Sequence, residues 1–283
     1  MLFIGINQVS LYHNDFVIPI KKPNIMSKIK KQALLTTNNV KTMKGEKLGY
    51  KTYILYMSSY KDNSKGINLC SHASSGCATA CLVGSGLGGL YTSVQNARRN
   101  KSEFFLSNRN EFLNQLFDEV TKIVKKSVDD FIPTIRLNGT TDIRWEKFRV
   151  FENNTKNIFE MFPTVQFYDY TKNHLRFNQT LPSNYHLTFS RSETNNVKAM
   201  ELLKRGFNVA MVFDKTPTNY KGFEVVNGDE TDLRFLDGTN VIVGLKYKNL
   251  TGKGANNKEA FESGFAIRLN TKVIKTKKVL EMA

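Results

Sequence analysis

The chain has 283 residues, 40% of them hydrophobic and 11% aromatic, which suffices for one large buried core and excludes a disordered protein. Its 41 Lys and Arg against 25 Asp and Glu give a net charge of +16, so polyanions such as nucleic acid are candidate partners, although the charge is spread along the chain. The three cysteines are gathered in one motif, which excludes a disulfide framework and indicates a reducing compartment.

Residues 1–45 are expected to form an N-terminal extension, disordered in part. Its apolar start is too short for a signal sequence, and no stretch of the chain approaches the ~20 apolar residues of a membrane span. Met26, which precedes a basic run, is a second candidate translation start. We therefore predict a cytoplasmic protein with no membrane partner, while the sequence does not indicate an oligomeric state.

Residues 46–250 are predicted to form one α/β domain. Residues 50–60 are aromatic and β-branched, as in a buried strand. The clearest helix opens at Ser107 or Asn108 and keeps an apolar stripe to residue 124. Further candidate helices end at Phe162 and span residues 196–205. Six more candidate strands are short and apolar: residues 134–138, 165–170, 186–190, 209–213, 223–226 and 241–245.

Seven strands separated by helices are typical of a parallel α/β sheet. The number of repeats favours an incomplete (β/α) barrel of mainly parallel strands, related to the TIM barrel, over a doubly wound sheet. Residues 251–283 are expected to follow it as a basic C-terminal segment. In such a fold the chemistry collects at the carboxyl ends of the strands.

All three cysteines, Cys70, Cys77 and Cys81, lie within a dozen residues, with the spacing C-x6-C-x3-C. Thiolates bind soft or borderline metals, and this spacing can close three corners of a tetrahedron. With His72 at the fourth corner the site would be a structural zinc. With an exogenous ligand there, it would be a [4Fe-4S] cluster with one open iron. The third alternative is three buried thiols without a metal.

Polar residues follow four of the predicted strands, where turn formers are common but where the rim of a barrel would also gather a site. They include residues 138–146, 168–172, 190–193 and 227–232.

The combination of these motifs resembles the gene product 88 family of phage and plasmid proteins. The resemblance covers about residues 45–250 and rests on the cysteine motif followed by Leu82 and glycines, and on short segments farther along. These segments are Ala97-Arg98, Arg136-Leu-Asn-Gly-Thr-Thr-Asp-Ile, Trp145-Glu146 and Tyr168-Asp-Tyr-Thr-Lys172. No established activity comes with that family.

The cysteine loop and strand order are similar to those of radical S-adenosylmethionine proteins, although the usual spacing there is C-x3-C-x2-C. This likeness implies a [4Fe-4S] cluster on the three cysteines and S-adenosylmethionine as cosubstrate. Asn138, Asp142 and Ser190 would then hydrogen-bond the cosubstrate, and Lys172 or Arg136 would neutralise its carboxylate. Catalytic residues and the substrate are not legible.

The alternative function is a nucleic-acid-binding or replication-associated protein with a structural Cys3His zinc site. Tyr168-Asp-Tyr-Thr-Lys172 is close to a tyrosine pattern of rolling-circle nicking enzymes, but these also need a His-hydrophobic-His pair, and no two of the four histidines stand two residues apart. Electrostatic binding to DNA or RNA is the simpler form of this alternative.

Overall fold

The computed structural model describes residues 32–37, 40–81, 84, 89–128, 130–251 and 257–269. The chain divides into two units, Met1–Gln32 and Ala33–Ala283, and all the described residues except Gln32 belong to the second unit. Much of the predicted N-terminal extension, and most of the predicted basic C-terminal segment, lie outside the described residues. None of the described helices is long and apolar enough to cross a membrane.

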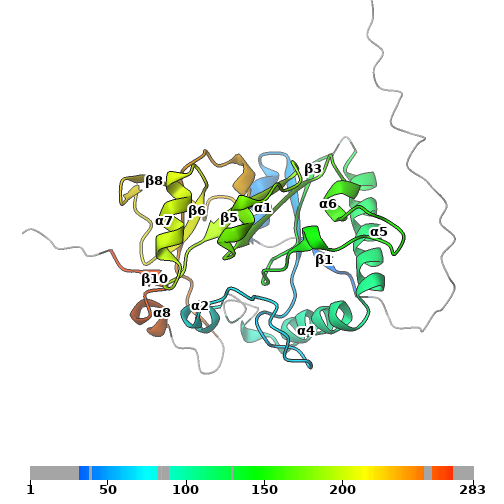
Figure 1. The fold of residues 1–283 in the computed structure, drawn as a ribbon, viewed down its shortest axis with the longest axis horizontal. Helices are drawn as coiled ribbons and strands as arrows, with labels where there is room; N and C mark the ends of the chain where they lie inside the picture. Colours follow the sequence, from blue (N-terminus) through cyan, green and yellow to red (C-terminus); the bar gives the residue numbers. More distant parts are fainter. Residues whose placement is uncertain are drawn as a thin grey trace, which may run out of the picture. The chain divides into compact units, whose positions relative to one another are not determined.

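One sheet of ten strands organises the described part of the chain (Figure 1). All seven predicted strands are present and pair in parallel, which confirms a mainly parallel α/β fold. Along the sheet they are β2 (Tyr50–Leu55), β3 (Ile132–Arg136), β4 (Gln166–Thr171), β5 (Tyr185–Ser190), β6 (Val209–Phe213), β9 (Ile242–Lys246) and β8 (Phe223–Asn227).

Three two-residue strands were not predicted. β1 (Leu35–Thr36) and β7 (Asn219–Tyr220) pair antiparallel at the two edges. β10 (Ala266–Ile267) pairs with the second half of β6, while β5 pairs with its first half. The described pairings run from β1 to β7 without joining the two edges, so the observed sheet is open along this path.

One side of the sheet is covered by helices. Apolar side chains of α5 (Arg109–Ser127), α6 (Ile158–Met161) and α7 (Asn196–Lys204) form one buried cluster with those of the strands. Gly206 ends α7 with a φ of +93°, a conformation that glycine adopts without strain. We call this side the helix face.

A second long helix, α4 (Thr92–Ser107), precedes α5 and was not predicted. It places Phe105 against Phe112 and Trp145, with ring centroids 5.3 Å apart in both pairs. Asn108 separates the two helices as predicted, although its side chain makes no capping hydrogen bond. The shorter elements are α1 (Val40–Glu46), α2 (Ser75–Thr79), α8 (Glu259–Glu262), η2 (Trp145–Lys147), η3 (His174–Asn178) and η4 (Arg234–Leu236).

The other side of the sheet carries mostly polar residues along β2 to β5, whereas along β6 and β9 it is apolar, with Ala210 opposite Val243. Tyr168 is in register with His186, and Tyr170 with Thr188, so these side chains are neighbours on one side. Asp232, in the segment after β8, accepts hydrogen bonds there from Arg136 Nη1 at 2.9 Å and from the Tyr168 hydroxyl at 3.2 Å. We call this side the polar face; its residues are Thr52, Thr134, Arg136, Tyr168, Tyr170, His186 and Thr188.

Candidate functional site

The segment that carries the cysteines, residues 56–81, begins after β2, and we call it the cysteine segment. It is hydrogen-bonded to the loop that follows β3. The backbone N–H of Asp142 donates to the carbonyl of Leu69 at 2.9 Å, and the hydroxyl of Thr140 donates to the carbonyl of Met57. Gly139 allows this approach, because a Cβ there would lie 2.6 Å from Ile54 Cγ2. The loop containing Cys70 is therefore held at the carboxyl ends of two adjacent parallel strands.

Glu193, just after β5, anchors the other end of the cysteine segment. Its carboxylate accepts from the Ser74 hydroxyl and from the Gly76 N–H, both at 2.8 Å. Ser74 in turn accepts from the Cys77 N–H at the start of α2. A Cβ on Gly76 would lie 2.8 Å from the Glu193 carboxylate, so this contact requires glycine. The segment thus spans from the β2–β3 end of the rim to the β5 end.

The three thiols are half-buried and form no disulfide. Cys70 Sγ lies 3.5 Å from the Thr140 carbonyl oxygen, and Cys81 Sγ lies 3.5 Å from the Ser59 hydroxyl. Burial above all, together with the nearby Cys81, Asp142 and Cys77, raises the pKa of Cys70 to about 12. The Cys70 thiol is therefore held in its neutral form in the free protein.

Lys172 joins Cys77 to the strand ends. Its ammonium group donates to the Ser190 hydroxyl at 2.8 Å, and its backbone N–H donates to the Asp142 carboxylate at 2.8 Å. Burial raises the pKa of Cys77, whereas Lys172 lowers it through its charge and a hydrogen bond. Four residues predicted from the sequence, Cys77, Lys172, Ser190 and Asp142, are therefore linked in one place, which we call the rim cluster.

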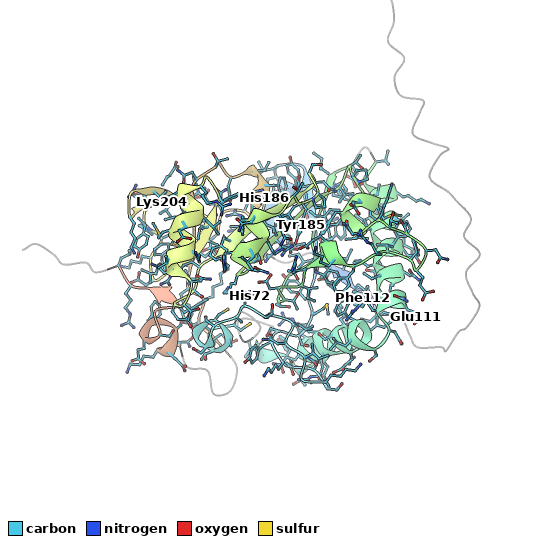
Figure 2. The ribbon with its side chains drawn as sticks, in the orientation of Figure 1. His72, Glu111, Phe112, Tyr185, His186 and Lys204 are labelled. Atoms are coloured by element: carbon cyan, nitrogen blue, oxygen red, sulfur yellow. The ribbon has the colours of Figure 1, made fainter. Side chains whose placement is uncertain are left out.

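His72, the predicted fourth zinc ligand, is exposed and lies on the segment before α2 (Figure 2). Its Nδ1 is 3.0 Å from the Ser71 hydroxyl. Within the described ranges, no three or more His, Cys, Asp or Glu side chains gather as a group that could hold a metal ion. The donor chemistry of three free thiols fits zinc or an iron–sulfur cluster, but their positions give the predicted metal no geometric support.

Asn138 lies behind the rim cluster and organises the loop after β3. It is 3% exposed, and its side-chain oxygen accepts from the Thr141 hydroxyl, the Ile143 N–H and the Trp145 indole N–H. Its amide nitrogen donates to the Ile143 carbonyl and to Asp169. The structure therefore places Asn138 as an architectural residue of the rim.

Arg136 lies on the polar face. It pairs with Asp232, and its guanidinium lies over the ring of Tyr170, 4.8 Å from the centroid. These contacts are with residues outside the rim cluster. Its predicted part in neutralising a cosubstrate carboxylate therefore stays a prediction, as does cofactor binding by Asn138.

Sequence reasoning did not assign a role to Glu193 or Thr140. Both lie in the polar segments noted after predicted strands, so the signal existed, but their contacts with the cysteine segment join residues 70 to 119 positions apart. Spacing along the chain cannot show such contacts.

The sequence profile of a family described as Gene product 88 matches residues 29–268, which is most of the chain. The chain belongs to the gene product 88 family. The comparisons with curated proteins and with solved structures gave no match. The family assignment confirms the resemblance seen in the motifs, while the cluster, the cosubstrate and the nucleic-acid partner stay predictions.

Proposed function

We propose that this family member is an iron–sulfur enzyme that holds a cluster on Cys70, Cys77 and Cys81 and binds a small cosubstrate, S-adenosylmethionine, at the rim cluster. The observation that carries the proposal is the placement of the cysteine segment. It follows the first strand of a parallel sheet and is anchored by loops after β3 and β5, at the end of the sheet where such folds collect their chemistry.

The thiols must be deprotonated to serve as ligands, and burial opposes this. Lys172 offsets part of the penalty at Cys77, since its positive charge favours the thiolate. Its half-buried position and the Ser190 hydroxyl orient the ammonium group at the rim, where it can also receive an anionic group of a small molecule. A cluster with one open iron would supply one-electron reduction of the cosubstrate.

The thiols need to draw closer to one another for all three to bind one centre. Their segment contains only one short helix, α2, and its anchors at Leu69, Ser74 and Gly76 leave residues 70–73 between them. The proposal therefore predicts a change in this segment on metal loading that leaves the sheet unaltered.

The test is to purify the full chain without oxygen and to measure iron, acid-labile sulfide and zinc per chain. The expected result is iron and sulfide, with broad absorption near 400 nm that dithionite bleaches. Cys77→Ser should lose the iron and keep the folded state, as judged by circular dichroism. Iron content that is unchanged in Cys77→Ser, or absent from the wild type, would contradict the proposal.

His72→Ala separates the cluster from the zinc alternative. A cluster on three cysteines should keep its iron in this variant. One zinc per chain that is lost on His72→Ala would instead establish the structural Cys3His site. Lys65→Ala is a suitable surface control, because Lys65 is exposed and its Nζ donates to the Leu106 carbonyl.

A further inference from the structure

A set of buried polar atoms on the polar face has no hydrogen-bond partner among the described residues. These atoms are the Tyr170 hydroxyl, His186 Nε2 and the Thr188 hydroxyl. Thr188 is 0% exposed, so its hydroxyl has lost water as well as partners. Leaving such a group unpaired destabilises the folded state, and folded proteins keep few of them.

The three residues are not scattered. Tyr170 and Thr188 are register partners on β4 and β5, and His186 stands two positions before Thr188 on the same side of β5. Figure 2 labels His186 on this strand. Two positions farther along each strand stand Lys172 and Ser190.

The polar face therefore carries a column of paired residues that leads inward from the rim cluster. Lys172 and Ser190 form its outer pair, Tyr170 and Thr188 its middle pair, and Tyr168 and His186 its inner pair. At about 3.3 Å per residue, the outer and inner pairs are roughly 13 Å apart. A molecule that contacts all three pairs is longer than a simple inorganic ion.

Charge along the column is uneven. At the inner end, Arg136 pairs with Asp232, and Arg234 pairs with Asp237. Lys172, at the outer end, donates to a neutral hydroxyl rather than to a carboxylate. The Asp142 carboxylate of the rim cluster accepts from the Lys172 backbone N–H, so among the described residues the Lys172 ammonium group has no carboxylate partner and can receive an anionic group.

The unpaired atoms of the middle and inner pairs suit hydroxyl groups. Tyrosine and threonine hydroxyls can each donate or accept a hydrogen bond, and a neutral imidazole nitrogen can do either according to its tautomer. Burial, together with the nearby Arg234, lowers the pKa of His186 and so favours its neutral form. Ligand hydroxyls, which also donate and accept, can satisfy all three.

We infer that the polar face binds an elongated polyhydroxylated molecule with one anionic end, of the sugar phosphate or sugar acid class, with the anionic group at Lys172 and hydroxyls at Tyr170, Thr188 and His186. The inference rests on the proposed function for the rim cluster as the point of entry. It adds the chemical class of the substrate, a molecule distinct from the cosubstrate.

The experiment measures binding of ribose 5-phosphate and of gluconate to the full chain by calorimetry and by the shift in Tm. At least one of the two is expected to bind with a concentration-dependent rise in Tm. Thr188→Val, which keeps the shape of the side chain, and Tyr170→Phe should each weaken that binding tenfold or more. Thr239→Val, in an exposed loop, is the matched control and should bind as the wild type does.

Lys172→Met should weaken ribose 5-phosphate more than it weakens uncharged ribose, which locates the anionic end. Failure of both probes at millimolar concentration would overturn the inference. So would equal binding by inorganic phosphate alone, or affinities that Thr188→Val and Tyr170→Phe leave unchanged. Binding is measured in parallel on Cys77→Ser, so a missing metal and a missing ligand are separate results.

Discussion

The two sides of β4 and β5 treat their buried polar groups in opposite ways. On the helix face, the Asp169 carboxylate accepts from the Asn138 N–H at 2.7 Å, the Asn138 amide and the Tyr185 hydroxyl. On the polar face, the hydroxyls of Tyr170 and Thr188 find no partner among the described residues. On one side of this pair of strands, Asp169 and Tyr185 thus belong to a connected network. On the other side, Tyr168 donates to Asp232, but within the described part of the chain the Tyr170 and Thr188 hydroxyls are unpaired.

The paired groups hold loops in place, whereas the unpaired groups are available to bind a ligand. A connected network fixes the loop after β3, because Asp169 and Tyr185 link Asn138 to Arg176 and Glu146. Unpaired groups fix nothing and cost stability in the free protein, which is the usual price of a surface kept ready for a ligand. Substitutions on the helix face should therefore cost stability, and those at the rim should change reactivity.

Arg176 gives the largest expected effect. It is fully buried, and its guanidinium lies 2.7 Å from the Glu146 carboxylate and 3.2 Å from the Tyr185 hydroxyl. Arg176→Met should lower the free energy of unfolding by about 3 kcal/mol, because the buried Glu146 carboxylate loses its nearer and fully buried cation and keeps only Arg144 at 3.4 Å. Urea denaturation measures this.

The matched control is Lys198→Ala, which breaks a pair between side chains that are 47% and 51% exposed. It should cost at most about 0.5 kcal/mol. Equal losses of unfolding free energy in the two variants would show that the buried network does not stabilise the folded state.

Titration of the buried Asp169 carboxyl should make the stability of the protein depend on pH. Burial raises its pKa from 3.8 to about 7, so the folded state holds a proton that the unfolded state releases between these values. The contribution is fully present below pH 4 and is lost as pH rises through 7, by up to about 4 kcal/mol. Asp169→Asn should flatten this part of the stability curve. An unchanged slope would mean that the surrounding donors keep Asp169 ionised.

Glu193 tests how the rim holds the cysteine segment. Glu193→Ala removes the acceptor of the Ser74 hydroxyl and the Gly76 N–H, so α2 should open more often. Alkylation of Cys77, followed by peptide mass spectrometry, should become several times faster with little change in overall stability. Glu262→Ala, which breaks an exposed pair with Lys258, is the control. Similar rates of Cys77 alkylation in both variants would show that Glu193 does not hold α2 closed.

The fold was predictable where local pattern and burial agree. The seven parallel strands are short and rich in apolar, aromatic or β-branched residues, so each could be predicted from the sequence. α4 was not predicted, because its apolar residues Phe104, Phe105 and Leu106 gather at its end and give no stripe along its length. β1 and β10 have two residues each, and pairing with a distant strand, rather than local preference, creates them.

The site was predictable only as a location. Cysteines after the first strand and polar residues after later ones meet at one rim, which explains why Lys172, Ser190 and Cys77 were found. Asn138 was predicted to bind a cofactor, which stays a prediction; the structure shows that its side chain organises the turn after β3, a role that was not predicted. Which polar side chains a loop uses for itself depends on its folded path, and residue type does not reveal it.

Lys172 gives the smallest effect and the closest view of the rim. Its charge lowers the pKa of Cys77 against the larger, opposite effect of burial. Lys172→Met should therefore shift the pH midpoint of Cys77 alkylation upward, because the thiolate loses its neighbouring cation. Lys172→Arg keeps the charge, so its pH midpoint of Cys77 alkylation should lie close to that of the wild type. If Met and Arg gave the same midpoint, the ammonium group would not act on this thiol, and the link between the cysteine segment and the column on the polar face would be broken.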